Sequence, residues 1–279
     1  MKYSIEQLTL DDMDLIINLS TSVGWDYTSK EVKVFLESGT LFGHREGHSL
    51  VSCAGIFSYG DLASIGAVMV HPEYQGQGLG RVLMNHCLYG LEDDPIMLVS
   101  TEEGKKLYRS LGFKTVSHIH KLVSERPIRL SNPPAPTEEI NPMTAADLDD
   151  VIQLDAAVSG ANRTQFLKGR FPFLNAGVTF RSHDGIQGYA MTVCRHDLLI
   201  VGPVVAPSLE ISVAMVDFLI DGWQGRMRID VPSSQKEFFE TLVLQGFQEV
   251  ERPPVMMRNA TKLPGKRNRL YAIAAQALG

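Results

Sequence analysis

The chain has 279 residues, a formal net charge of −6 and a hydrophobic content of 44%. This length exceeds one typical domain, and the acidic balance argues against a nucleic-acid-binding protein, which usually carries a basic excess. No apolar run is long enough to span a bilayer, and the first residues read as a strand and not as a signal peptide. We therefore expect a soluble, cytoplasmic protein with no membrane partner.

Cysteine and histidine positions give no sign of a metal site. The three cysteines are widely spaced in apolar segments, which favours reduced core residues over a disulfide or a zinc site. The histidines at 71, 118 and 120 have no metal-ligand partners at usable spacing. We expect no metal.

Two capping boxes mark helix starts near the N-terminus. In such a box, a side chain and a backbone N–H three residues apart satisfy each other reciprocally. The boxes are Thr9 with Asp12 and Thr28 with Glu31. The surrounding apolar and turn patterns predict strands at residues 4–8, 39–45, 49–59, 63–70 and 97–101.

A glycine-rich loop follows the strand that ends at Val70. Pro72 stops the strand, and residues 75–81 read QGQGLGR before an amphipathic helix. The glycines leave backbone N–H groups uncovered at the helix N-terminus. Uncovered N–H groups at the positive end of a helix form an anion site, so the sequence predicts a phosphate-binding loop.

Different phosphate ligands fit this loop to different degrees. A P-loop needs a Lys and a Ser or Thr after its last glycine, and their absence argues against ATP and GTP. A dinucleotide fingerprint has GxGxxG directly after its strand, whereas this loop reads GxGxG after the intervening residues 71–75. NAD stays a weak alternative, as does a turn with no ligand.

The loop resembles the pyrophosphate-binding motif of the GNAT acyltransferases, in which Gln or Arg, two residues and Gly-x-Gly or Gly-x-Ala follow a strand end. The segment KLYRSLGF at residues 106–113 is similar to the LYxxxGF segment that closes the acyl-CoA site in that family. The resemblance covers residues 1 to about 123. It implies a GNAT fold with acetyl-CoA (coenzyme A) as co-substrate.

The resemblance also implies which residues contact coenzyme A: a splayed strand end that pairs with pantetheine amides, the loop, the helix start and the segment that closes the site. These residues are Val68, Met69, Val70, Gln75, Gly76, Gln77, Gly78, Leu79, Gly80, Arg81, Thr101 and Tyr108. A backbone N–H of the splayed strand, at Met69 or a neighbour, is expected to stabilise the oxyanion.

Tyr108 is the candidate catalytic residue. The resemblance implies direct attack of a free amine on the thioester with both substrates bound together, and the leaving thiolate then needs a proton. A phenol has a pKa near 10 and a thiol somewhat lower, so the transfer is close to balanced. The alternative is that Tyr108 only packs or hydrogen-bonds the sulfur.

Acceptor contacts and the general base are less defined. In the GNAT fold the loop between the first two helices lines the acceptor pocket, so Trp25 and Tyr27 are candidate substrate contacts; packing of Trp25 beneath the loop is the alternative. Residues 62–67 contain no carboxylate, although many GNATs place a base there. The base stays open between a water chain, Glu102, Glu103 and the second half.

A proline-rich stretch at residues 126–139 predicts an extended linker between a catalytic domain, 1–125, and a second domain, 140–279. The second domain repeats the first. Thr144 and Asp147 follow Thr9 and Asp12 by 135 residues, and Gly246-Phe247 follows Gly112-Phe113 by 134. We expect tandem GNAT folds of the α/β (α+β) class, each a mixed, mostly antiparallel twisted sheet flanked by helices.

The second copy lacks the chemistry of the first. Residues 210–215, at the position of the loop, contain no glycine and begin with a glutamate, and Leu242 stands at the position of Tyr108. This layout resembles the bacterial two-domain acetyltransferases with a degenerate C-terminal half of the Acetyltransf_18 type. The residues that carry this resemblance are Asp155, Gly160, Arg163, 202–206, Asp230, 271–274 and 277–279.

The expected function is an acetyl-CoA-dependent N-acetyltransferase that acts on the primary amine of a small molecule, with the C-terminal domain helping to form the acceptor site. A non-catalytic acyl-CoA-binding sensor is the alternative, because the strand carboxylate is missing.

Arg163 and Arg252 are expected as surface ion pairs or as anchors for an acidic acceptor. The basic cluster at 262–269 is expected to be a solvated tail or to lie along the coenzyme A 3′-phosphate. The amine, the acyl chain preference and the oligomeric state stay open.

Overall fold

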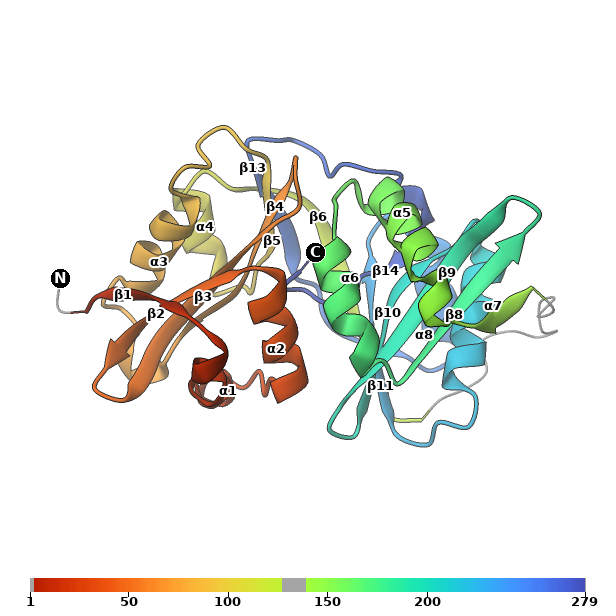
Figure 1. The fold of residues 1–279 in the computed structure, drawn as a ribbon, viewed down its shortest axis with the longest axis horizontal. Helices are drawn as coiled ribbons and strands as arrows, with labels where there is room; N and C mark the ends of the chain where they lie inside the picture. The colour runs from red at the N-terminus through yellow and green to blue at the C-terminus, as the bar shows by residue number, and fades with distance from the viewer. Residues whose placement is uncertain (1–2, 127–138, 279) are drawn as a thin grey trace.

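The computed structural model describes residues 3–126 and 139–278, and its two halves lie side by side (Figure 1). The first half contains β1 (Ile5–Leu8), α1 (Met13–Ser22), α2 (Ser29–Ser38), β2 (Thr40–Glu46), β3 (Ser49–Ser58), β4 (Ala63–Val70), α3 (Leu79–Leu88), β5 (Ile96–Val99), α4 (Lys105–Ser110) and β6 (Lys114–Ser124). The second half contains β7 (Ile140–Pro142), α5 (Leu148–Ser159), α6 (Thr164–Arg170), β8 (Ala176–Ser182), β9 (Gly185–Arg195), β10 (Leu198–Val205), α7 (Leu209–Ile220), β11 (Arg226–Pro232), α8 (Lys236–Leu244), β12 (Gln248–Glu251), β13 (Pro254–Arg258) and β14 (Leu270–Ala272).

The predicted local structure of the first half is confirmed. The Thr9 N–H donates to the Asp12 carboxylate at 2.8 Å, and the Glu31 N–H donates to Thr28 Oγ1 at 3.3 Å. Each predicted strand is present within two residues of its expected bounds. The proline-rich linker lies outside the described residues except at its ends, so it stays a prediction.

The second half repeats the first at equivalent positions. The Asp12 carboxylate binds Arg45 of β2, and the Asp147 carboxylate, in its own capping box, binds Arg181 of β8. These two ion pairs tie the first helical turn of each half to its second strand. The tandem repeat of one fold is therefore confirmed at the level of individual contacts.

The same repetition appears after α4 and α8. Gly112 and Gly246 both have a φ of +89°, a conformation that favours glycine. In each half the next residue, a phenylalanine, closes the turn: the Phe113 N–H donates to the Tyr108 C=O and the Phe247 N–H to the Leu242 C=O, both at 3.1 Å.

The two halves exchange strands. The strands of the described chain form one 14-stranded sheet in the order β1-β2-β3-β4-β5-β13-β6-β11-β10-β9-β8-β7, with β12 on β6 and β14 on β10. β13 lies between β5 and β6 of the first half and is antiparallel to both. In return, the distal part of β6 pairs with β11 and β12. Each half therefore completes its sheet with a segment of the other.

Only β4·β5 and β10·β11 are parallel among the described strand pairs, which confirms a mixed, mostly antiparallel sheet. A shared hydrophobic core lies between the halves. It joins Val32 and Phe57 of the first half to Phe166 and Tyr189 of the second, all fully buried, and includes the C-terminal residues from Ile273 to Leu278. No helix in the described part of the chain could cross a bilayer.

Candidate functional site

β4 and β5 run side by side for two residues and then separate. Their parallel pairing is confined to Ala63 with Ile96 and Ser64 with Met97. Directly after this point the register between β3 and β4 shifts, and Ala67 adopts a φ of +51°. A bulge of this kind bends a strand away from its neighbour. The ends of β4 and β5 therefore form a splay, as the sequence predicted for Val68 to Val70.

The backbone of β4 presents Val70 to this splay. The His71 N–H donates to the Val51 C=O of β3 at 2.9 Å, so the preceding residue directs its N–H and C=O to the opposite edge. Gln75 Nε2 donates to the Val70 C=O at 3.2 Å. Met69 pairs with Cys53 of β3. Val70, a neighbour of Met69, is therefore the better candidate for the backbone donor.

The glycine-rich loop carries a run of free N–H groups. Gly76 and Gly78 have φ values of +76° and +83°, and a Cβ at either would meet nothing within 4 Å. α3 follows without a side-chain cap, and its first helical bond is from the Val82 N–H to the Gly78 C=O. Within the described chain, the N–H groups of residues 76–81 have no acceptor. This cradle at a helix N-terminus fits the phosphates of coenzyme A.

Tyr108 lies on α4, 7% exposed, in one core cluster with Ile65 of β4 and Leu98 of β5. Its ring packs edge-on against Phe113 with the centroids 6.2 Å apart. Burial raises the pKa of the Tyr108 phenol, so the hydroxyl stays protonated at neutral pH. No described residue accepts its proton. The ring of Tyr108 is therefore buried, whereas its hydroxyl, which is not among the fully buried unpaired atoms, is open to a hydrogen-bond partner.

Two hydrogen bonds position the helices around Tyr108. Thr101 Oγ1 accepts from the Gly104 N–H at 3.2 Å and so shapes the turn before α4. Arg81 Nη2 donates to Ser110 Oγ at 2.8 Å, which ties α3 to α4. Both predicted residues thus hold the two helices that flank the splay.

The loop with Trp25 and Tyr27 is held by the second half. Tyr27 is 9% exposed, and its ring lies edge-on to Trp25 and beneath the Arg195 guanidinium of β9, 5.5 Å away. Arg195 also binds the Glu31 carboxylate and donates to the Trp25 C=O at 3.2 Å. Burial raises the pKa of Tyr27. Tyr27 is thus part of the core between the halves, whereas Trp25 is partly exposed.

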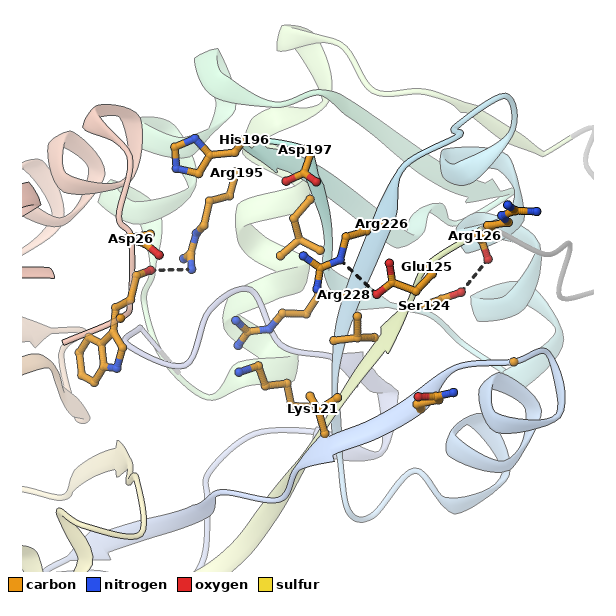
Figure 2. Close-up of a pocket in the computed structure, with 17 residues that line it drawn as sticks. Asp26, Lys121, Ser124, Glu125, Arg126, Arg195, His196, Asp197, Arg226 and Arg228 are labelled. Carbon is orange, nitrogen blue, oxygen red and sulfur yellow. Dashed lines mark hydrogen bonds and ion pairs between the residues drawn. The ribbon is translucent and has the colours of Figure 1, made fainter. Parts of the chain in front are cut away.

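Trp25 borders a cavity with a volume of about 700 Å³. Lys121 and Arg228 point from neighbouring strands toward the side where Asp26 lies (Figure 2). Four of its basic residues already bind carboxylates: Arg195 binds Glu31, Arg228 binds Asp230, Lys121 binds Glu251 and Arg226 binds Glu125. Its lining includes no predicted coenzyme A contact.

The second cavity, of about 40 Å³, lies against β5. Its walls are Met97, Val99, Ser117, Ile119 and Val255 on the strands of the first sheet, with Pro232, Ser234, Leu263, Arg267 and Ile273 from the second half. The sequence interpretation of residues 262–269 as a solvated tail missed Arg267, whose side chain turns inward and is only partly exposed. No periodic pattern marks such a residue.

Other predicted polar residues are placed differently from expectation. Arg163 is 3% exposed, and its guanidinium forms a bidentate pair with Asp155 at 2.9 and 2.6 Å, so the expected surface ion pair is a buried one. Glu102 is largely exposed and pairs with Lys105. Among the described residues, no group of three or more His, Cys, Asp or Glu could hold a metal ion.

In the second half the corresponding splay is filled. β10 and β11 pair through Val201 and then separate at Gly202, which corresponds to Ala67 and has a φ of +150°. β14 enters this space and pairs with β10 at Val204 and Val205. The Ile273 N–H donates to the Asp230 C=O at 2.9 Å. The chain itself occupies the place that a ligand would take in the first half.

Comparisons with known proteins agree with the geometry. Two family models, each described as an acetyltransferase (GNAT) domain, match residues 37–115 and 151–272. The chain is 32% identical over 270 residues to the uncharacterised N-acetyltransferase YitH of Bacillus subtilis, covering 95% of this chain and 94% of that protein. It is 23% identical over 278 residues to a holothin acyltransferase of a Pseudoalteromonas species, covering 97% and 92%.

Solved structures share the fold. A putative acetyltransferase from Pyrococcus horikoshii superposes with a TM-score of 0.83 at 20% identity, covering 99% of this chain and 96% of that one. A tandem GNAT protein from the clavulanic acid biosynthesis pathway superposes with a TM-score of 0.67 at 13% identity, covering 91% and 98%. These likenesses show a tandem arrangement of two such domains.

Proposed function

Because the chain belongs to the GNAT acetyltransferase family, we propose that it transfers an acyl group from acetyl-CoA to the primary amine of a small molecule, by direct attack in a ternary complex. The first half holds acetyl-CoA, and the second half helps to form the acceptor site. The observation that carries this proposal is the open splay of β4 and β5 beside a loop of free N–H groups.

The first half offers groups that suit each part of acetyl-CoA. The N–H groups of residues 76–81 face the pyrophosphate, and the edge of β4 that faces the splay offers strand-like pairing to the pantetheine amides. Acetyl-CoA supplies the acyl group as a thioester, which an amine attacks directly. A strand N–H facing the splay stabilises negative charge on the acyl oxygen.

Tyr108 supplies the proton in this proposal. Its hydroxyl is protonated at neutral pH and has no partner among the described residues, so it is available to the leaving thiolate. β4 carries no carboxylate, and we assign no general base to it. The second half contributes to the acceptor side by holding Trp25 through Arg195 and by packing its C-terminal segment against Gly66 of β4.

The test is an initial-rate study with acetyl-CoA and a panel of primary amines, following thiol release and the mass of the amine. The proposal predicts an amine heavier by one acetyl group and intersecting double-reciprocal lines. Parallel lines together with an acetylated protein would contradict direct attack. Tight acetyl-CoA binding without thiol release from any amine would instead support the acyl-CoA sensor.

A further inference from the structure

The interface between the halves contains arginines with and without a carboxylate partner. Arg163 is paired with Asp155, and Arg195 with Glu31. Arg170 and Arg267, in contrast, have no carboxylate within ion-pair distance among the described residues. Two guanidinium groups are thus left in this interface without a protein counter-ion.

The guanidinium of Arg170 is buried and has few hydrogen-bond partners. Its side chain is 93% buried, its Nη2 donates to the Gly202 C=O at 3.1 Å, and its Nε has no partner. Burial lowers the pKa of Arg170 to about 10, a balance in which the Glu31 carboxylate raises it and nearby Arg163 lowers it. Burying a cation without a counter-ion is costly, so an anion that enters this region would be stabilised.

Arg267 is the unpaired arginine that reaches a cavity. Its Nε donates to the Pro264 C=O at 3.2 Å, and burial lowers its pKa to about 10. It lines the 40 Å³ cavity together with Met97 and Val99. Met97 is the last residue of β5 that pairs with β4, and Val99 lies beyond it, so the cavity adjoins the splay.

The size and lining of the cavity limit what it can bind. A volume of 40 Å³ is little more than the roughly 30 Å³ that one water molecule occupies in the liquid, so the cavity admits a group of a few atoms. Apolar side chains form most of the wall, while Ser117, Ser234 and Arg267 provide its polar groups. A carboxylate matches the planar fork of a guanidinium in both size and charge.

We propose that the acceptor amine also carries a carboxylate, which Arg267 binds in this cavity beside the splay. The acceptor is then an amino acid or a similar amine-bearing acid, whose carboxylate occupies the cavity and whose remaining atoms lie outside it. This inference rests on the proposed acetyl transfer. Arg267 takes the place of Arg163 as the anchor for an acidic acceptor, because the Arg163 guanidinium is paired with Asp155.

The test compares amines that differ only by the carboxylate, namely leucine against isopentylamine and phenylalanine against phenethylamine. Each is assayed with acetyl-CoA and the wild-type protein, Arg267→Met, Arg267→Lys and the control Lys266→Met, whose side chain is exposed. We expect the wild type to favour the amino acids. Arg267→Met should reduce kcat/KM for amino acids by about 10- to 100-fold and leave the plain amines unchanged. Arg267→Lys should restore part of the loss.

A stability readout separates an anchor from a structural residue. Because Arg267 has no carboxylate within ion-pair distance among the described residues, Arg267→Met is expected to leave the melting temperature unchanged or raised. A lowered melting temperature with equal losses for both amine classes would overturn the anchor in favour of a structural role.

Two further outcomes distinguish the anchor from the transfer reaction. Acetylation of plain amines as fast as of amino acids would overturn the anchor while the transfer reaction stands. A rate gain with succinyl-CoA that Arg267→Met removes would assign the arginine to the acyl group and overturn the acceptor assignment. Absence of thiol release with every amine would overturn both proposals.

Discussion

The starts of α3 and α7 differ in the features on which the proposed acetyl-CoA site depends. α3 follows Gly78 without a side-chain cap, whereas the Ser208 hydroxyl caps α7 by accepting from the Ile211 N–H. The splay of β4 and β5 is open, whereas β14 fills that of β10 and β11. The comparison teaches that such a site disappears when the chain satisfies its own backbone groups, with the fold unchanged.

The largest expected effect is the loss of the proposed proton donor, Tyr108, because the second half has a leucine at the equivalent position. Replacing Tyr108 by Phe removes the proposed proton donor and keeps the ring packing. We expect kcat to fall by roughly 10²- to 10⁴-fold with little change in acetyl-CoA affinity. Tyr89→Phe, at a residue that is 86% exposed, is the control and should have no effect. An unchanged kcat in Tyr108→Phe would show that the phenol only packs.

A second prediction concerns the close approach of the C-terminal segment to each splay. A Cβ at Gly66 would lie 2.1 Å from the Ala277 C=O, and one at Gly202 would lie 2.1 Å from the Ile273 C=O. Gly66→Ala should therefore displace the segment and lower the free energy of unfolding by about 1–3 kcal/mol, measured in urea.

The control for this change is Gly169→Ala, where the nearest atom would be 3.6 Å away and the backbone is helical. This variant should be as stable as the wild type or more stable, by up to about 1 kcal/mol. Equal stability of Gly66→Ala and Gly169→Ala would mean that the C-terminal segment is not fixed against β4.

The smallest expected effect on stability comes from the equivalent capping boxes at Asp12 and Asp147, one in each half. Burial opposes ionisation of Asp12 and Asp147, but the hydrogen bonds from Thr9 and Thr144 and the partner arginines outweigh it and lower the pKa of both carboxyls. Asp12→Asn and Asp147→Asn should each lower the free energy of unfolding by about 1 kcal/mol at neutral pH.

The sign of the pH dependence provides a check on this prediction. Because the folded-state pKa is lowered, the stabilisation is complete above the ordinary carboxyl pKa of about 4 and is lost as the pH falls through the folded-state value. The melting temperatures of the wild type and both variants should therefore converge as the pH falls below the folded-state pKa. A difference that persists there would point to packing and not to charge.

Local features of the fold were predictable because they depend on neighbouring residues. The capping boxes follow from short spacings, and the structure confirms them; the repeat of Gly112-Phe113 at Gly246-Phe247 is visible in the sequence, and both glycines have the same φ. The exchange of β13 and the distal part of β6 was not predictable. An apolar strand pattern indicates a buried strand, but it does not tell which of two equivalent sheets the strand enters.

Part of the candidate site could also not be predicted from the sequence. The loop at residues 75–81 carries its own signature, because glycine and a helix start are enough to define a phosphate cradle. Arg267 has no such sequence signature, because the residues that surround it lie on β5, β6 and the end of β11, far away in the chain. Arg163 was expected at the surface, and only the fold brings it to Asp155 in the interior.

The most direct test of the central claim is calorimetric titration with acetyl-CoA of the wild type, Gly78→Glu and Gly90→Glu. Both glycines are exposed, have φ near +80° and would place a Cβ in open space, so the variants share strain and charge and differ in position. We predict one site per wild-type chain and at least a 100-fold weaker affinity in Gly78→Glu, because a carboxylate then faces the pyrophosphate. Gly90→Glu should bind normally. Equal binding by all three proteins, or two sites per chain, would contradict a single acetyl-CoA site in the first half.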